Sequence, residues 1–256
     1  MTTEVDLLDG ELVLQGRLMQ ASNATFVGTI GAEQVVYKPI AGEAPLWDFP
    51  DGDLARREYA AYLVSEVLGW DVVPLTWLRD GPMGHGMVQR WREVDPTQSA
   101  VDLVPAGEVP ETGWRHVFDG LDAHDRPVAL VHEDSAALRR MTVFDVIVNN
   151  ADRKGGHVLE MADGHRHGVD HGLTFHAEHK LRTVLWGWVD EPLLPDELAG
   201  VQRARDALGR GLGDAMDDLL TQHEIAAFAG RCDRLLRRGT FPGPHGGMPP
   251  IPWPPF

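Results

Sequence analysis

The stretch FDVIVNNADRKGGHVLEMADGHRHGVDHG, residues 144–172, decides how the rest of the chain is interpreted. An apolar run ends in two asparagines, and a polar turn with Asp152, a basic pair and two glycines follows. Two short strands then lead to Asp170. Two carboxylates at ~4 Å repel each other by about 4 kcal/mol at an effective dielectric constant near ~20, and a bound cation removes that repulsion. Mg²⁺ prefers one or two carboxylates together with substrate phosphates, so the pattern predicts a magnesium–phosphate site.

The same segment resembles the catalytic loop of atypical kinases, namely the phosphatidylinositol 3-/4-kinases and the HipA-type toxin kinases. Their loop contains Asp-Arg-His and, five residues after the Asp, an Asn that binds metal; an Asp-containing metal triplet follows one hairpin later. Asp152–Lys154 matches the first triplet except that Lys154 replaces His, His157 stands in place of the Asn, and Asp170–Gly172 matches the second triplet. Most of the chain also resembles an actinobacterial group placed with these kinases, and that resemblance names no substrate.

The resemblance implies an α+β fold with the two lobes of a protein kinase. Residues 1–92 would form a small, mostly β N-lobe, residues 93–240 a mostly helical C-lobe, and residues 241–256 a proline-rich tail. Proline continues neither a helix nor a central strand, so the tail is expected to be an extended polyproline-type arm. A tail packed through Trp253 and a free tail are both open alternatives.

The resemblance also implies residue roles and cofactors. Asp152 would accept the proton of the attacking hydroxyl, and Lys154 would neutralise charge on the transferring group. His157 and Asp170 would bind the metal ion. The implied cofactors are ATP and Mg²⁺ or Mn²⁺, and the acceptor is a protein, a small metabolite or the chain itself. Imidazole is a softer ligand than Mg²⁺ prefers, so His157 predicts a preference for Mn²⁺ if it binds the ion directly; the alternative is that it holds a metal-bound water.

Residues 11–38 predict three strands, and the turn MQASNAT between the first two is rich in small and polar residues. In a kinase this hairpin covers the phosphates. The backbone N–H groups of Ser22, Asn23 and Ala24 are therefore expected to face them. The alternative is a turn that only joins two strands.

Lys38 ends the third of these strands, where its ammonium can reach phosphate oxygens. An exposed lysine at a strand end is the competing interpretation. Asp53 is expected to cap a helix that runs to about Leu68. Glu58 lies one turn inside this helix, where a kinase has the Glu that pairs with the strand Lys. Glu66 is the competing candidate for that pair.

Two further strands are expected at residues 72–78 and 86–91. The second would lead into the hinge between the lobes, where adenine usually rests on backbone hydrogen bonds. Gln89, Arg90 and Trp91 are candidates for this contact by their position alone.

Residues 93–113 are polar and contain three prolines, so they are expected to connect the lobes. A strand–turn–strand hairpin is expected within residues 117–134. Ser135 then caps a helix that ends at the asparagine pair. Asp145 lies among apolar residues of this helix, and a buried carboxylate needs partners. We expect it to bond to backbone near the catalytic loop.

After residue 172 the chain continues with the apolar segment 181–188, which either shapes a substrate pocket or packs in the core. Trp186 and Trp188 favour the core. Helices are expected at residues 196–209 and, with a break, at 213–239, because apolar residues recur there at helical spacing.

Composition limits the partners and the compartment. The chain has 23 Lys and Arg against 39 Asp and Glu, a net charge of −16, which disfavours nucleic acid and anionic membranes as partners. A nucleotide would need local positive charge from Lys38, Arg153 and Lys154. No signal peptide and no apolar run of about 20 residues is present, so no integral membrane association is expected. The single cysteine, Cys232, fits a reducing cytoplasm.

Two other functions compete with the kinase interpretation. A nucleotide-binding pseudokinase or scaffold would explain the departure at His157. A transition-metal hydrolase would use the histidines that crowd around Asp170, although no recognised ligand spacing appears among them. These histidines are His157, His165, His167, His171, His176 and His179.

Overall fold

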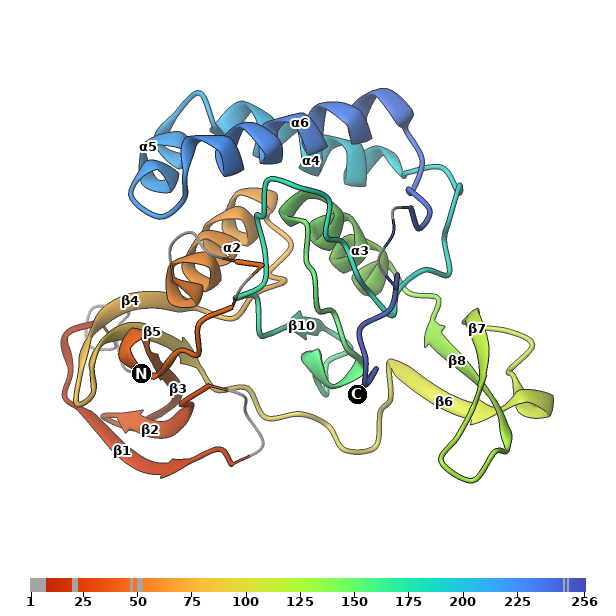
Figure 1. The fold of residues 1–256 in the computed structure, drawn as a ribbon, viewed down its shortest axis with the longest axis horizontal. Coiled ribbons are helices and arrows are strands. Elements are labelled where there is room, and N and C mark those ends of the chain that lie inside the picture. The colour runs from red at the N-terminus through yellow and green to blue at the C-terminus, as the bar shows by residue number, and fades with distance from the viewer. Residues whose placement is uncertain (1–7, 20–22, 47, 50–52, 246, 248) are drawn as a thin grey trace.

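The computed structural model describes residues 8–19, 23–46, 48–49, 53–245, 247 and 249–256. It has a mixed α+β architecture, with an antiparallel sheet in the N-terminal region and helices in the C-terminal region (Figure 1). The α+β class expected from the sequence is confirmed.

The N-terminal sheet is antiparallel throughout, in the order β1-β2-β3-β5-β4. The three strands expected within residues 11–38 are all present. The fourth strand begins later than residue 72, because Val73 donates its N–H to Ser65 Oγ and Val72 accepts from Gly168. The strands are β1 (Leu12–Arg17), β2 (Phe26–Ile30), β3 (Glu33–Pro39), β4 (Thr76–Gly81) and β5 (Gly84–Arg90).

Helix α2 (Leu54–Leu68) connects β3 to β4 and has the ends that the sequence predicts. The Asp53 side chain accepts from the N–H of Arg56 and satisfies one of the free donors of the first turn. Gly69 ends the helix with φ 67°, a left-handed conformation that costs glycine little.

A second antiparallel sheet precedes the next helix and consists of β6 (Val101–Pro105), β7 (Trp114–Leu121) and β8 (Pro127–Glu133), in the order β6-β8-β7. The expected hairpin is β7 and β8. The expectation that residues 93–113 only connect two lobes is wrong in part. Residues 101–105 pair with β8 over five positions, and this tertiary partner makes a strand of a segment that also contains Asp102 and Pro105, residue types depleted in strands.

The C-terminal region begins with α3 (Ala136–Val148), which Ser135 caps and which Asn149 ends at φ 57°. The hairpin β9 (Val158–Glu160) and β10 (Arg166–Gly168) follows the segment 149–157. Three helices complete the region, namely α4 (Pro195–Ala207), α5 (Gly211–Asp217) and α6 (Gln222–Arg238).

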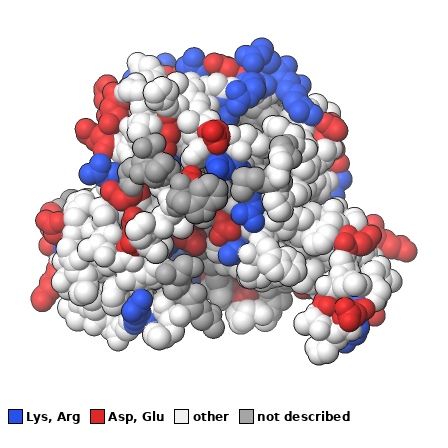
Figure 2. All heavy atoms as spheres, in the orientation of Figure 1, with Lys and Arg blue, Asp and Glu red and all other residues white. Residues whose placement is uncertain are grey.

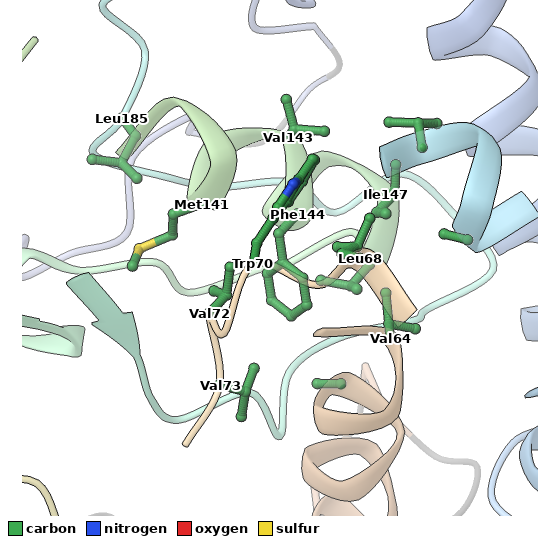
Figure 3. Close-up of a cluster of buried hydrophobic side chains, with 14 of the residues drawn as sticks. Val64, Leu68, Trp70, Val72, Val73, Met141, Val143, Phe144, Ile147 and Leu185 are labelled. Carbon is green, nitrogen blue, oxygen red and sulfur yellow. The ribbon is translucent and has the colours of Figure 1, made fainter. Parts of the chain in front are cut away.

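The main apolar core joins α2 to the C-terminal helices. Figure 3 shows Val64 and Leu68 of α2 meeting Phe144 and Ile147 of α3, and all four side chains are fully buried. Trp188 is also in this core, so this part of segment 181–188 packs inside the protein. A smaller cluster lies against the N-terminal sheet and contains Leu12, Ile30, Val35, Tyr37, Trp77 and Val88.

The end of the chain returns to the middle of the molecule (Figure 1). Pro250 accepts hydrogen bonds from the N–H of Thr183 and from Trp186 Nε1, and Pro255 accepts from the N–H of Gly155. The side chain of Trp253 is largely exposed. The described part of the tail packs through these backbone carbonyls and through the buried Phe241 and the partly buried Ile251, and Trp253 does not anchor it.

Charge is unevenly distributed over the surface. Figure 2 shows Lys and Arg grouped near the end of α6, whereas Asp and Glu are scattered over much of the same face. Arg237 and Arg238 belong to the last turn of α6, where cations interact favourably with the helix dipole. Among the described residues, no helix has the length and apolar content needed to cross a membrane.

Candidate functional site

A cavity of about 990 Å³ collects most of the residues that the sequence singles out. Its wall includes β3, the first turns of α2, the end of β5 and the segment from Asp152 to Leu173. The expected site residues that line it are Asn23, Ala24, Lys38, Glu58, Gln89, Arg90, Trp91, Asp152, Lys154, His157 and Asp170. Ser22 lies outside the described residues.

The first charged pair of the cavity is Lys38 of β3 and Glu58 of α2. Along β3, Val35, Tyr37 and Pro39 are buried on one face, so Lys38 projects from the other face into the cavity. Lys38 Nζ lies 2.7 Å from Glu58 Oε1 of α2 and 2.7 Å from Asp170 Oδ1. Three segments that are distant in sequence therefore meet at one ammonium group. Glu66 is exposed on another part of α2, so Glu58 is the helix residue that pairs with Lys38.

The three charges respond differently to this environment. Burial lowers the pKa of Lys38, but the charges of Asp170 and Glu58 outweigh it and the net shift is upward. The charge of Lys38 holds the pKa of Asp170 well below its ordinary value. Burial raises the pKa of Glu58 against the opposing effect of Lys38. Glu58 Oε2 also accepts the N–H of His171, which fixes the carboxylate between β3 and the Asp170 segment.

Asp152 follows the end of α3 and faces the same cavity. Its N–H donates to Asn150 Oδ1, and its Oδ2 lies 3.4 Å from Lys154 Nζ. Burial raises the pKa of Asp152, while Lys154 and His157 act in the opposite direction. A carboxylate with a raised pKa is a better proton acceptor than an ordinary aspartate.

Arg153 does not contribute positive charge to the cavity, contrary to the expectation from sequence. Its side chain is fully buried, and its Nε and Nη2 donate to the two carboxylate oxygens of Asp145 at 2.9 Å. Asn150 Nδ2 donates to Asp145 Oδ1 as well. The partners of the buried Asp145 carboxylate are therefore the side chains of Asn150 and Arg153, and the expected backbone partners are wrong.

His157 occupies a position suited to a metal ion. Its Nδ1 lies 2.9 Å from the carbonyl oxygen of Asp152, so that nitrogen carries the proton and donates it. Burial lowers the pKa of His157, which favours the neutral ring with a lone pair on Nε2. Nε2 lies 3.5 Å from Asp170 Oδ2. Asp152, His157 and Asp170 offer one ligand atom each, all within 4.8 Å of one another.

The hairpin between β1 and β2 differs from the expectation. The N–H of Ala24 donates to the carbonyl oxygen of Gly42 at 3.1 Å, and Asn23 Oδ1 accepts the N–H of Ala44 at 2.8 Å. Because the segment at residues 42–44 already accepts the Ala24 N–H, the expectation that this group faces a phosphate is wrong for this structure. Both residues still line the cavity.

The three residues chosen as adenine contacts line the cavity, but two of their backbone donors are already used. The N–H of Arg90 donates to Leu75 O, and the N–H of Trp91 donates to Gln34 O. The Gln89 side chain is buried and donates to Thr76 Oγ1. The wall continues beyond the expected hinge, with Arg92, Glu93 and Val94.

Sequence reasoning missed the apolar part of the wall. Val36 shares the cavity-facing side of β3 with Lys38, and Leu159 of β9 lines the same cavity. The strand alternation around Lys38 was a signal for Val36. Leu159 carries no such signal, because its place depends on how the β9–β10 hairpin packs. Glu43 was also missed; its carboxylate accepts the N–H groups of Leu54 and Ala55 at the start of α2.

The six histidines do not form one centre, so the metal-hydrolase interpretation is not supported. His165 and His167 contact Asp71, and His171 is buried against Arg153 Nη2. His176 packs on Phe49, and His179 stacks on His245. Among them, only His157 and His171 lie next to Asp170, and His171 does not line the cavity.

The mixed α+β fold contains a cavity in which one lysine, one buried glutamate and two aspartates lie close together. The chain is 50% identical to Protein Rv2133c of Mycobacterium tuberculosis over 263 residues, which cover 98% of this chain and 94% of that protein. The chain therefore belongs to the same family as Protein Rv2133c, a name that states no activity.

Two other comparisons complete this picture. No model of a protein family matches the chain. The crystal structure of the Helicobacter pylori proinflammatory kinase CtkA is similar with a TM-score of 0.48 and 12% sequence identity, covering 92% of this chain and 94% of that chain.

Proposed function

We propose that the protein transfers a phosphoryl group from ATP to a hydroxyl group and requires a divalent metal ion. The observation that carries the proposal is the meeting of Lys38, Glu58 and Asp170 at 2.7 Å contacts beside Asp152 in one cavity. Phosphoryl transfer needs a lysine fixed by a glutamate, an aspartate for the metal and an aspartate for the attacking hydroxyl. The four side chains supply these groups.

The nucleotide would enter with its phosphates toward Lys38. At present Lys38 bridges two carboxylates, and a metal ion on Asp170 would free part of the ammonium charge for the phosphates. The apolar side chains of Val36 and Leu159 offer a surface for the adenine ring. The volume of the cavity is at the upper end of the range usual for small-molecule sites.

Asp152 is the proposed general base, and Lys154 is the proposed cation next to the transferring group. Burial of Asp152 favours proton uptake, and the ammonium of Lys154 at 3.4 Å keeps the carboxylate ionised before the reaction. The transition state of phosphoryl transfer carries negative charge on its equatorial oxygens. A lysine that lies in the cavity beside the base stabilises that charge.

Asp170 and His157 are the proposed metal ligands. The imidazole of His157 offers its Nε2 lone pair in the direction of the Asp170 carboxylate. Carboxylate oxygens suit Mg²⁺ and Mn²⁺ equally, and imidazole shifts the preference toward Mn²⁺. We therefore propose that both metals support the activity and that Mn²⁺ supports it better.

The test measures ATP binding by calorimetry and ADP formation with label transfer from radioactive ATP, each with Mg²⁺ and with Mn²⁺. We expect metal-dependent binding and transfer by the natural chain, and loss of transfer in Lys38→Met and Asp170→Asn. Glu58→Gln should lower activity strongly, whereas Glu66→Gln, on the same helix but outside the cavity, should not. Absence of ATP binding in the natural chain, or equal effects of the two glutamate variants, would overturn the proposal.

A second candidate function is nucleotide binding without transfer, as in a pseudokinase or scaffold. The specific observation that favours it is that an imidazole, His157, stands at the position proposed for a metal ligand. Metal-dependent ATP binding with no label transfer to any acceptor, including the chain itself, would establish this alternative. The proposed division into lobes at about residue 92 is compatible with both functions.

A further inference from the structure

A second group of metal-binding side chains lies outside the cavity. Asp71, His165 and His167 offer one ligand atom each, and these atoms lie within 4.8 Å of one another. None of the three lines the large cavity. Asp71 belongs to the turn after α2, while the two histidines belong to the β9–β10 hairpin. The group therefore joins the end of a helix from the N-terminal region to a hairpin of the C-terminal region.

Strand geometry explains why the two histidines point the same way. His165 directly precedes β10 and His167 lies in it, and at this two-residue spacing the side chains of an extended segment share one face. Arg166 between them points to the opposite side and pairs with Glu133 at 3.0 Å. The N–H of Gly168 donates to Val72 O at 2.7 Å and holds the hairpin against the turn after α2.

The donor atoms converge on a single residue. His165 Nε2 lies 2.7 Å and His167 Nδ1 lies 2.9 Å from the carbonyl oxygen of Asp71, and the two ring centroids are 4.3 Å apart. His165 Nε2 is also 3.9 Å from Asp71 Oδ2. Asp71 has φ 51°, a left-handed conformation that aspartate adopts more readily than most residues. Two ring N–H groups thus donate to the carbonyl oxygen of one aspartate; an ion bound at these nitrogens would displace both hydrogen bonds and move each proton to the other nitrogen of its ring.

We propose that Asp71, His165 and His167 form a binding site for a transition-metal ion of the zinc class. Two imidazoles and one carboxylate are a usual ligand set for Zn²⁺ with three protein ligands, and they suit Mg²⁺ poorly. Asp71 also lines a separate pocket of about 220 Å³, and its side chain is 59% exposed, so an ion can reach it from solvent.

The bound ion would fasten the turn after α2 to the β9–β10 hairpin. The hairpin leads directly to Asp170, and the turn follows the helix that carries Glu58. The ion therefore holds together the two segments that place these carboxylates. This role is separate from the proposed metal of the cavity, and it does not depend on phosphotransfer.

The test uses the chain without a histidine tag, stripped of metal, in the Asp170→Asn background so that the cavity group is impaired. Co²⁺ is titrated and followed by its visible absorption, and Zn²⁺ is then added to displace it. We expect one Co²⁺ per chain with the absorption of a four-coordinate site. We also expect the ion to raise the thermal unfolding temperature, because it binds the folded chain selectively.

Two variants decide whether these residues are the ligands. His167→Gln retains a side chain that can donate to the Asp71 carbonyl but has no imidazole, so its fold should be preserved and its Co²⁺ binding lost. His116→Ala, an exposed histidine paired with Asp119, is the matched control and should bind Co²⁺ as before. Absence of stoichiometric binding in the Asp170→Asn background, or unchanged binding in His167→Gln, would overturn the proposal.

Discussion

Two networks of charged side chains, one in the cavity and one in the core, differ in their access to solvent. In the cavity network, the side chain of Asp170 is 50% exposed and that of Lys38 is 22% exposed. In the buried network, Asp145 and Arg153 are both 0% exposed. Asp152 and Arg153 are adjacent in sequence, yet one faces the cavity and the other faces the core.

The difference separates side chains that a ligand can reach from side chains that hold the segment from Asn150 to Arg153 in place. The buried Asp145 carboxylate already accepts hydrogen bonds from Arg153 and Asn150, so it is not available to a ligand. Removal of one partner of such a pair leaves an uncompensated charge in a medium of low polarity. In the cavity network, the carboxylates of Asp152 and Asp170 are 21% and 50% exposed, so they contact solvent and can exchange partners. Substitutions in the two networks should therefore affect different measurable quantities.

The largest expected effect is on activity in the cavity. Asp152→Asn should lower the rate of phosphotransfer by about 10²–10⁴-fold, the usual contribution of a general base. The free energy of unfolding should change little or rise, because burial already disfavours the charged form of Asp152. Steady-state kinetics with either metal and urea unfolding would check both expectations. A variant with full activity would remove Asp152 from the proposed mechanism.

The next effect concerns stability in the buried network. Arg153→Met should lower the free energy of unfolding by about 3–5 kcal/mol, because it leaves the Asp145 carboxylate buried without its main partner. Arg126→Met is the matched control, since Arg126 pairs with Asp122 at an exposed site and such pairs contribute little. Urea unfolding of both variants measures the difference. Equal stability losses would show that burial does not distinguish the two ion pairs.

The buried His132 should make the stability of the protein depend on pH. His132 donates from Nδ1 to Glu133 O and accepts the N–H of Gly187 at Nε2, so the native state needs the neutral ring. Burial lowers the pKa of His132 from 6.5 to about 4. Because the folded pKa is the lower one, the associated stability is complete above pH ~6.5 and is lost as the pH falls toward ~4.

The expected loss from His132 alone is about 3 kcal/mol over that interval. His132→Gln should flatten the pH dependence of unfolding between these limits, whereas His124→Gln, at an exposed turn, should leave it unchanged. The lowered pKa values of His167 and His179 add to the slope in all of these proteins, so the difference between variants isolates His132. An unchanged slope in His132→Gln would contradict the assignment.

Local patterns were sufficient to locate the elements that carry the cavity network. Strand alternation around Lys38, the cap at Asp53 and the place of Glu58 one turn later are all properties of short segments. Nearby residues of one segment share a face, so the direction of their side chains follows from the element. The α+β class was expected from the resemblance to atypical kinases.

The sequence did not predict that Arg153 is buried while Lys154 lines the cavity. Both are basic residues in one polar turn, and only the position of Asp145 on the packed helix α3 draws Arg153 inward. The same limit applies to β6, which exists because β8 supplies its partner, and to the N–H of Ala24, which Gly42 accepts. In each case the decisive partner is distant in sequence.

The smallest expected effect is a change of metal preference within the cavity. His157→Asn replaces an imidazole nitrogen by an amide oxygen, a harder ligand that suits Mg²⁺ better than Mn²⁺. The ratio of activity with Mn²⁺ to activity with Mg²⁺ should fall on the order of tenfold, which corresponds to ~1.4 kcal/mol of differential binding. Metal titrations of the rate at saturating ATP would measure this ratio. Equal activity with both metals in the natural chain, unchanged in the variant, would mean that His157 does not bind the ion. His157 would then have a structural role only, through the hydrogen bond from its Nδ1 to the carbonyl oxygen of Asp152. In that respect it would resemble the residues of the buried network, although it lies in the cavity.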